Sequence, residues 1–339
     1  MSVRRILLLV SVVLLASYQA VALHDGGSTA ALAGTQAART CGAASEEYTG
    51  PFDAPYGVKA ILSKQRPDRR AYGWPVKPFD RQHVVRAYLN DPRIYRTDRS
   101  FHFGIDISVP PGTAVYAVEP GRAYKANRWA VSVRGNGRSF AYWHIVPVVG
   151  GGRWVGRHAL LGHTRSMFNH VHFAEFRAGR YLNPLRTGGI GPFRDRTAPI
   201  VERLTFREHP RLWLEPAHVR GTVDLVADAC DIAPGVEREP WPVAPALVRW
   251  RIFRGDALVA GWRTAVDLAP RQLAMKRFGL IYAYGTRQNK PGRPGEYCFY
   301  LAHRWSSKSL RNGFYRIEVA AADVHGNVGI GNFAFQIVN

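Results

Sequence analysis

Cysteine is scarce in this sequence, which has only Cys41, Cys230 and Cys298 among its 339 residues. Three cysteines exclude a scaffold of several disulfides, and the lack of paired thiols leaves nitrogen and oxygen donors for any metal site. At most one bridge can form. Cys230 and Cys298 are the natural pair in an oxidising compartment, because both lie in strand-like segments of the same half of the chain.

Long apolar runs are also lacking. An apolar stretch over residues 6–16 follows two arginines, but it is too short to span a bilayer, which needs about 20 residues. The small residues of Ala20-Val21-Ala22 suit cleavage by a signal peptidase. We predict that residues 1–22 are a secretory signal and that the mature protein is secreted, periplasmic or associated with the cell wall. Retention of the signal as a membrane anchor is the alternative.

Acidic residues are few: 25 Asp and Glu stand against 46 Lys and Arg, which gives a formal net charge of +21. The arginines are scattered and form neither a basic stripe nor a recognisable nucleic-acid-binding module, so we expect no nucleic-acid partner. For an exported protein, the long-range electrostatic field of this positive charge favours an anionic surface, such as cell-wall polymers, as the binding partner. An Arg-rich composition without any binding role is the alternative.

Amphipathic helix patterns are also rare, and only residues 271–278 fit a short helix. Strand-like runs recur in the second half of the chain, over residues 219–227, 247–253, 296–301, 314–321 and 332–338. The last two are joined by Asp323 to Asn327, which suits a tight turn. These runs predict an immunoglobulin-like β-sandwich over residues 194–339.

The first half has a different composition. Residues 23–68 are rich in Ala, Gly, Ser and Thr and show little periodicity, so we expect a poorly ordered N-terminal segment. After it, short strands separated by Gly-rich turns predict a small antiparallel sheet domain over residues 69–193. The whole chain is therefore predicted to be mainly β.

Within this domain, the stretch from Phe101 to Ser108 reads FHFGIDIS and alternates strictly in character. Such alternation with aromatic and β-branched residues predicts a half-buried strand. Its polar face carries His102 and Asp106. Gly104 lies between them and leaves a gap that is large enough for a metal ion.

Two later segments repeat this pattern. Tyr142 and His144 share one face of a predicted strand over residues 139–146, and His170 and His172 share a face in the sequence HVHF. Imidazoles two residues apart on a strand are about 6.5 to 7 Å apart, so both can face one site without both binding one small ion. Trp143 is expected to pack in the core.

A shared metal site explains this conjunction of side chains. Imidazole and carboxylate ligands without thiols favour Zn²⁺ in an open site with three protein ligands and a water. Zinc lowers the pKa of this water from about 15.7 towards 7 and polarises the carbonyl group that is attacked. An adjacent uncoordinated histidine takes the proton or stabilises the oxyanion. The predicted chemistry is hydrolysis of an amide or ester.

These motifs resemble those of the lysostaphin-type, or LytM-domain, zinc endopeptidases, which cut peptide cross-links of peptidoglycan. The resemblance covers residues 72–184, about a third of the chain. The matching pieces are FHFGIDISVPPGTAVYAVEPGR, YWHI and HVHF, with Asn183-Pro184 just downstream.

The resemblance assigns a role to each of five residues. It implies that His102, Asp106 and His172 hold the zinc. It implies that His144 and His170 are the catalytic histidines beside the water. For the fold, it implies the small sheet domain of this family, which is of the duplicated hybrid motif type.

The chain departs from this family in the loop before the last histidine pair. Where a Gly-rich loop is usual, residues 162–169 read GHTRSMFN, with Arg165, Met167 and Phe168 in place of small residues. In the family, a glutamate commonly follows the phenylalanine of the last motif, which is Phe173 here. In this chain Ala174 intervenes and the glutamate is Glu175. These departures affect the groove wall and the choice of substrate, but they remove no ligand.

The remaining candidate residues are expected to have no role in a site. His158 and His163 are predicted to be surface residues. Asp224, Asp228 and Asp231 raise the question of calcium, but they show no ligand-spacing pattern and are expected to be solvated.

The sequence therefore predicts an exported, monomeric zinc metalloendopeptidase that hydrolyses peptide cross-links of bacterial peptidoglycan by attack of zinc-bound hydroxide. A catalytically silent wall-binding protein, or an activator of another wall hydrolase, is the alternative. A third reading is a zinc carboxypeptidase of the related D-alanyl-D-alanine-cleaving type. Those enzymes place a glutamate shortly before the last histidine, where Phe168 and Asn169 stand here.

Overall fold

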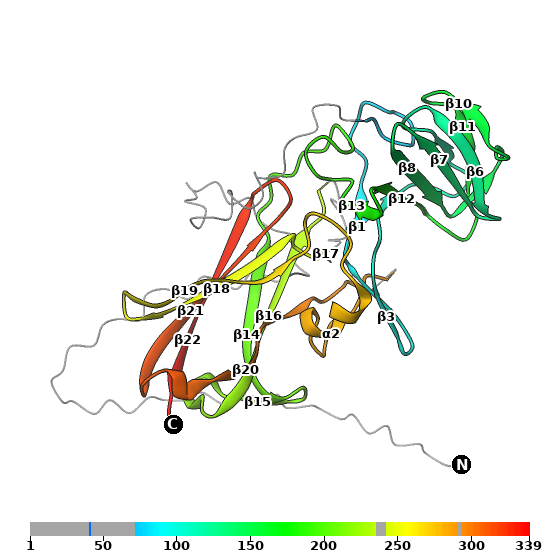
Figure 1. The fold of residues 1–339 in the computed structure, drawn as a ribbon. Helices are drawn as coiled ribbons and strands as arrows, with labels where there is room; N and C mark the ends of the chain where they lie inside the picture. Colours follow the sequence, from blue (N-terminus) through cyan, green and yellow to red (C-terminus); the bar gives the residue numbers. More distant parts are fainter. Residues whose placement is uncertain (1–40, 42–71, 235–241, 291–292) are drawn as a thin grey trace, which may run out of the picture. The chain divides into compact units, whose positions relative to one another are not determined.

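The computed structural model describes Cys41 and residues 72–234, 242–290 and 293–339 (Figure 1). These residues fold mainly into antiparallel strands, which confirms the predicted fold class. The predicted signal of residues 1–22 and the segment of residues 23–68 lie outside the described residues. Among the described residues, no helix is long and apolar enough to cross a membrane.

The N-terminal part of the described chain contains three sheets. The largest has eight strands: β1 (Val85–Ala87), β4 (Ile105–Ser108), β6 (Gly121–Asn127), β7 (Ala130–Gly135), β8 (Arg138–Trp143), β10 (Arg153–Val155), β12 (His170–Arg177) and β13 (Arg180–Leu182). Their order is β1-β4-β12-β8-β7-β6-β10, and β13 pairs with β12. The smaller sheets are β5 (Ala114–Tyr116), β11 (Leu160–Thr164) and β9 (Ile145–Pro147), and the hairpin of β2 (Pro92–Tyr95) and β3 (Asp98–Phe101). Central strands β4 and β12 bury Ile105, Ile107 and Phe173 completely in the core of this part.

The C-terminal part consists of two further sheets. One contains β14 (Ile200–His209), β15 (Leu212–Leu214), β16 (Thr222–Ile232), β17 (Pro242–Val243) and β20 (Cys298–Ser306). The other contains β18 (Leu247–Arg254), β19 (Ala257–Asp267), β21 (Gly313–Ala322) and β22 (Val328–Ile337). Phe206 and Leu225 of the first sheet share one core with Trp250 and Ile317 of the second, so the two sheets pack against each other. The immunoglobulin-like assignment and the domain boundaries stay predictions.

Two predicted strands are each interrupted in the structure. The stretch from Phe101 to Ser108 is divided, because β3 ends at Phe101 and β4 begins at Ile105. Phe101 packs in the core of the C-terminal part, whereas Ile105 packs in the N-terminal core, so the apolar residues of this stretch do not share one face. The predicted strand over residues 139–146 is also two strands, because the chain leaves the ladder at His144 with a φ of +67°.

The predicted short helix and the last predicted turn are both present. The helix lies later than expected, as a 3-10 turn at Met275–Arg277 followed by α2 (Phe278–Ile281). At the turn between β21 and β22, Asp323 Oδ1 accepts hydrogen bonds from the backbone N–H groups of residues 325, 326 and 327.

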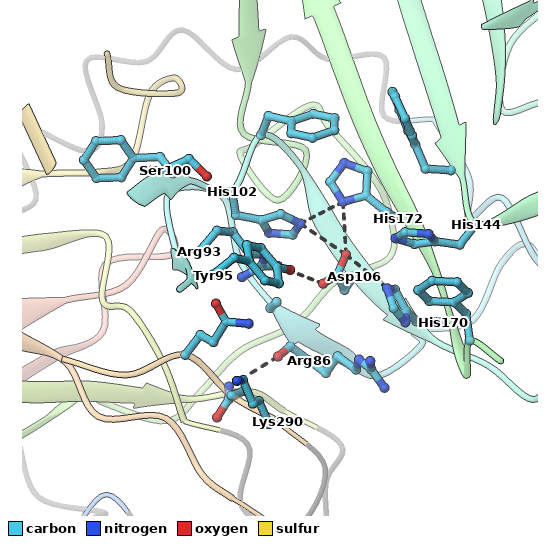
Figure 2. Close-up of a pocket in the computed structure, with 17 residues that line it drawn as sticks. Arg86, Arg93, Tyr95, Ser100, His102, Asp106, His144, His170, His172 and Lys290 are labelled. Atoms are coloured by element: carbon cyan, nitrogen blue, oxygen red, sulfur yellow. Dashed lines mark hydrogen bonds and ion pairs between the residues drawn. The ribbon is translucent and has the colours of Figure 1, made fainter. Parts of the chain in front are cut away.

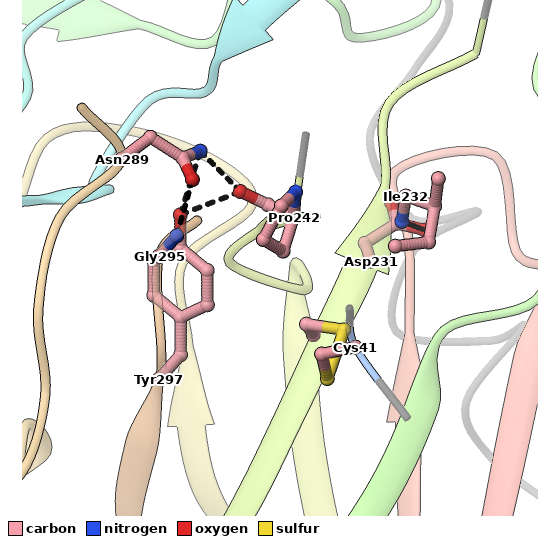
Figure 3. Close-up of a disulfide and its surroundings, with 8 residues drawn as sticks. Cys41, Asp231, Ile232, Pro242, Asn289, Gly295 and Tyr297 are labelled. Carbon is pink, nitrogen blue, oxygen red and sulfur yellow. Dashed lines mark hydrogen bonds between the residues drawn. A yellow bond between two sulfur atoms is a disulfide. The ribbon is translucent and has the colours of Figure 1, made fainter. Parts of the chain in front are cut away.

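The disulfide joins Cys41 to Cys230, with Cα atoms 6.0 Å apart (Figure 3). The expected Cys230–Cys298 pair is therefore wrong. In the β16–β20 ladder Cys298 lies opposite Asp228, two residues out of register with Cys230. At that offset Cα atoms are about 7–8 Å apart, beyond the usual reach of a disulfide. Cys298 is a buried free thiol in a small cluster outside the shared core.

Contacts around Asn90 connect the two parts and hold the segment that leads to His102. The Asn90 side-chain amide donates to the carbonyl groups of Leu268 and Arg271, at 2.8 and 2.9 Å. Tyr282 Oη donates to the Asn90 carbonyl at 2.8 Å. The chain is thus fixed where it enters the β2–β3 hairpin.

Candidate metal centre

Two neighbouring strands place Asp106 and His172 opposite each other. β4 and β12 are antiparallel, and their register pairs His172 with Asp106 and His170 with Ser108. Directly opposed residues of an antiparallel pair point to the same face, with Cβ atoms about 4.5–5.5 Å apart. The apolar neighbours of Asp106 and His172 are buried on the other face, so the carboxylate and the imidazole meet.

His102 reaches the same point from outside the strands. Backbone hydrogen bonds fix it to the opposite segment: Asn90 N donates to the His102 carbonyl, and His102 N donates to the Asp91 carbonyl, both at 2.9 Å. His102 Nδ1 lies 2.8 Å from the Tyr88 carbonyl oxygen. Because a carbonyl only accepts, Nδ1 carries the proton and Nε2 presents a lone pair, as is usual for a histidine that binds a metal.

The three donor atoms converge (Figure 2). His102 Nε2 lies 2.7 Å from His172 Nδ1 and 3.1 Å from Asp106 Oδ1, and His172 Nδ1 lies 3.0 Å from the same oxygen. Around a tetrahedral zinc, with bonds of about 2.0–2.2 Å, neighbouring ligand atoms are about 3.3–3.5 Å apart. The residues therefore fit zinc after small outward movements, and the nitrogen and oxygen donor set suits it.

The charge of the centre is set by Asp106. Burial by itself raises the pKa of Asp106, but His102 and Arg93 outweigh it and hold this pKa well below its ordinary value. Arg93 donates to Asp106 Oδ2 at 2.8 Å, which leaves Oδ1 directed at the two imidazoles. Burial lowers the pKa of His102 to about 3, so this imidazole is neutral at pH 7 and free to act as a ligand.

His144 and His170 lie beside the three converging groups. His170 Nε2 is 3.8 Å from Asp106 Oδ1, and the His144 and His170 rings meet edge to face with centroids 4.7 Å apart. His144 stacks on Phe168, with centroids 4.1 Å apart and planes 11° apart. Burial lowers the pKa of His144 to about 4 and that of His170 to about 3, so both are neutral at pH 7. Two neutral imidazoles next to a metal position can accept a proton.

The structure gives a different reason why a glycine is needed at position 104. The sequence led us to expect that this glycine leaves room for the ion. Instead, a Cβ at Gly104 would lie 2.3 Å from the Phe173 carbonyl oxygen and 3.0 Å from His172 Nε2. The space is filled by β12 and by the His172 ring. Gly104 thus allows the close approach that brings His102 to His172.

A cavity of about 440 Å³ opens over the centre. Its walls include side chains that the sequence did not indicate: Arg86, Arg93, Tyr95, Ser100, Gln288, Asn289 and Lys290. No local motif marks them, because they come from β1, the β2–β3 hairpin and a distant loop. Trp143 also lines the cavity, so its predicted place in the core is wrong. The β8–β12 register pairs it with His172.

Other predicted residues lie away from the centre. His158 and His163 are exposed, as expected, and do not line the cavity. Glu175 is fully buried and binds Arg186 through both carboxylate oxygens, at 2.7 and 2.8 Å, so it supports the sheet. The expected loop over residues 162–169 is shorter in the structure, because its first three residues belong to β11. In the remainder, Phe168 lines the cavity. Arg165 lies over the ring of Phe168, 5.1 Å from its centroid.

No protein-family model matches the sequence, and no curated protein is similar to it in sequence. Solved structures that resemble parts of it include Csd3 of Helicobacter pylori, with 20% identity and a TM-score of 0.30 over 38% of this chain and 37% of that chain. A zinc-containing peptidase of Vibrio cholerae has 22% identity and a TM-score of 0.29 over 34% of this chain and 39% of that chain. This chain thus covers less than two fifths of either protein.

Lysostaphin is similar over more of the length, 71% of this chain and 94% of its own, with 13% identity and a TM-score of 0.26. The neighbours thus include a protein described as a zinc-containing peptidase and lysostaphin, the type member of the family that the sequence motifs resemble.

Proposed function

We propose that this chain is an exported zinc metalloendopeptidase that hydrolyses peptide cross-links of bacterial peptidoglycan. The observation that carries the proposal is the convergence of His102, Asp106 and His172 at the base of an open cavity, with two further neutral histidines beside them. The cavity volume of about 440 Å³ lies within the range of pockets that bind small ligands. A disulfide between Cys41 and Cys230 supports an oxidising compartment.

In this proposal His102 Nε2, Asp106 Oδ1 and His172 Nδ1 hold the metal. Zinc, when bound, supplies a Lewis acid for the scissile carbonyl and makes a water nucleophilic at neutral pH. His170 accepts the proton of the attacking water and passes it to the leaving amine. His144 donates a hydrogen bond to the oxygen on which negative charge develops.

The test combines metal analysis with activity. The purified protein should contain about one zinc per chain and should release new amino groups from peptidoglycan. His172→Ala should lose both properties. His163→Ala is the matched control, because His163 is exposed and lies outside the cavity, and it should retain both.

Other outcomes would separate the alternatives. If wild type and His172→Ala were equally inactive on every cell-wall preparation, the proposal that the chain is an enzyme would be overturned. Zinc binding and co-sedimentation with walls, without release of amino groups, would support the silent wall-binding protein. Release of free D-alanine with intact cross-links would support the carboxypeptidase.

A further inference from the structure

Three acidic side chains from distant parts of the sequence meet at the junction of the two parts of the chain. Asp195 precedes β14, Asp231 lies near the end of β16, and Asp323 follows β21. Their exposed fractions are 8%, 0% and 1%. One oxygen of each lies within 4.8 Å of the others. Asp231, which the sequence led us to expect in solvent, is completely buried.

No basic side chain compensates this group. None of the ion pairs among the described residues includes Asp195, Asp231 or Asp323. Two other buried acids, Glu175 and Asp228, are each paired with an arginine; Asp228, at 3% exposure, is a further residue that was wrongly expected in solvent. Neutral hydrogen-bond donors satisfy some of the carboxylate oxygens of the cluster. Asp231 Oδ1 accepts from a backbone N–H, but among the described residues Asp231 Oδ2 is buried without a hydrogen-bond partner. Such a group is costly to bury.

A second, independent group points into the same place. The Tyr88 hydroxyl belongs to the N-terminal part, the residue is 4% exposed, and no partner for this hydroxyl is found in the described chain. Tyr88, Asp231 and Asp323 line one small cavity of about 10 Å³. This volume is about that of a single water-sized sphere. The Tyr88 hydroxyl thus adds a neutral oxygen to the buried carboxylates that line this cavity.

We propose that Asp195, Asp231, Asp323 and the Tyr88 hydroxyl form a structural calcium site. Calcium binds six to eight oxygens at about 2.3–2.6 Å, so oxygens on opposite sides of the ion are about 4.6–5.2 Å apart. One oxygen of each of the three carboxylates lies within 4.8 Å of the others, so a single ion can contact all three. Magnesium usually keeps several of its own waters, and a cavity of about 10 Å³ leaves little room for them.

The protonation of the empty cluster agrees with this assignment. Burial, with Asp195 and Asp323 nearby, raises the pKa of Asp231 well above its ordinary value. Burial and Asp195 raise the pKa of Asp323 to about 7. Without a cation, the cluster must therefore bind protons at neutral pH. With calcium, all three carboxylates can ionise, and the ion joins both parts of the chain beside the Cys41–Cys230 disulfide (Figure 3).

The test measures thermal unfolding of the zinc-loaded full chain in calcium-free buffer and in buffer with added CaCl₂. At calcium concentrations roughly 100-fold above the Kd, we expect Tm to rise by about 5 °C. Equilibrium dialysis should give about one calcium per chain. The same rise should occur in His172→Ala, which separates this site from the proposed zinc centre and from the proposed function.

The stability of Asp231→Asn relative to wild type should depend on calcium. Without calcium its Tm should equal or exceed that of wild type, because the amide removes a buried acid. With calcium it should stay unchanged while wild type gains. Asp224→Asn, the same change on the same strand at a partly exposed position, should keep the full calcium response. Tyr88→Phe should weaken calcium binding and leave the Tyr88 carbonyl bond to His102 intact.

Three results would overturn the proposal. They are an unchanged wild-type Tm at millimolar calcium, an equal calcium response in Asp231→Asn, and dialysis that finds no bound calcium. If Asp231→Asn does not fold in calcium-free buffer, dialysis of wild type and Tyr88→Phe still decides the matter.

Discussion

At the scale of single residues, the centre depends on a glycine. Gly104→Ala places a Cβ 2.3 Å from the Phe173 carbonyl oxygen, which is backbone and cannot rotate away. We expect the overpacking to cost about 1–3 kcal/mol of unfolding free energy. We also expect the displaced His172 ring to weaken zinc binding by at least about tenfold. Denaturant unfolding and a competition titration with a zinc chelator measure the two effects.

Gly156→Ala is the control for this change. No atom lies within 4 Å of a Cβ at Gly156, so its stability and zinc affinity should match those of wild type. A Gly104→Ala protein that binds zinc as tightly as Gly156→Ala would show that the close approach of His102 to His172 is not needed.

The residues of the centre were predictable because their chemistry is concentrated in short motifs. His102, Asp106 and His172 were identified from spacing and from family resemblance, and the structure brings them together. The alternating pattern predicted that His102 lies on the same strand face as Asp106. This reason is wrong, because it assumes that residues 101–108 form one continuous strand. Here the chain leaves the ladder between Phe101 and Ile105, and contacts with Asn90 and Asp91 return His102 to the centre.

At the scale of elements, the β2–β3 hairpin supplies a side chain that orients a ligand. Arg93 on β2 holds Asp106 Oδ2 at 2.8 Å and so directs Oδ1 at the imidazoles. Removing such an outer partner usually lowers metal affinity 10–100-fold. We therefore expect the zinc Kd of Arg93→Ala to rise by about 10–100-fold, with little change in Tm. Competition titration and thermal unfolding test this.

Arg99→Ala is the matched variant, because Arg99 lies on the same hairpin but is exposed, and within the described chain its hydrogen bonds go to backbone carbonyls. It should bind zinc as wild type does. Equal zinc affinities for Arg93→Ala and Arg99→Ala would contradict the proposal that Arg93 orients Asp106. Arg93 would then only line the cavity.

Elements were predictable where burial imposes a pattern. β18, β21 and β22 alternate in burial or are buried throughout, and the sequence placed a strand over each. Most of β19 faces solvent, so it lacks the apolar pattern by which a strand is recognised, and it was not predicted. The β2–β3 hairpin was missed for a similar reason, since it is short and mostly exposed or half-buried.

At the scale of the whole molecule, contacts between distant segments were beyond sequence reasoning. Asp231 alone gives no sign of Asp195 or Asp323, which lie 36 residues before it and 92 after it. The loop at Gln288 to Lys290 reaches the cavity only through the packing of the C-terminal part. Pairings of this kind depend on topology, and a single sequence shows only local periodicity and composition.

The disulfide is a further long-range contact, and it yields the last prediction. Cys41 and Cys230 are separated by 189 residues, and a cross-link closing so long a loop stabilises by about 5 kcal/mol in the chain-entropy model. Cys41→Ser should therefore lower the unfolding free energy by up to about 5 kcal/mol, measured by non-reducing denaturant titration. Cys298→Ala, which breaks no bridge, should cost only about 1 kcal/mol for the removed sulfur.

Thiol labelling of the wild type checks the same pairing directly. Burial raises the pKa of Cys298 to about 12, so at pH 8 the native protein contains almost no thiolate there and should resist iodoacetamide. In denaturant without reductant, one thiol should react, and peptide mapping should place it at Cys298. A peptide that links Cys230 to Cys298, or a label on Cys41, would refute the Cys41–Cys230 bridge and with it the expected loss of stability in Cys41→Ser.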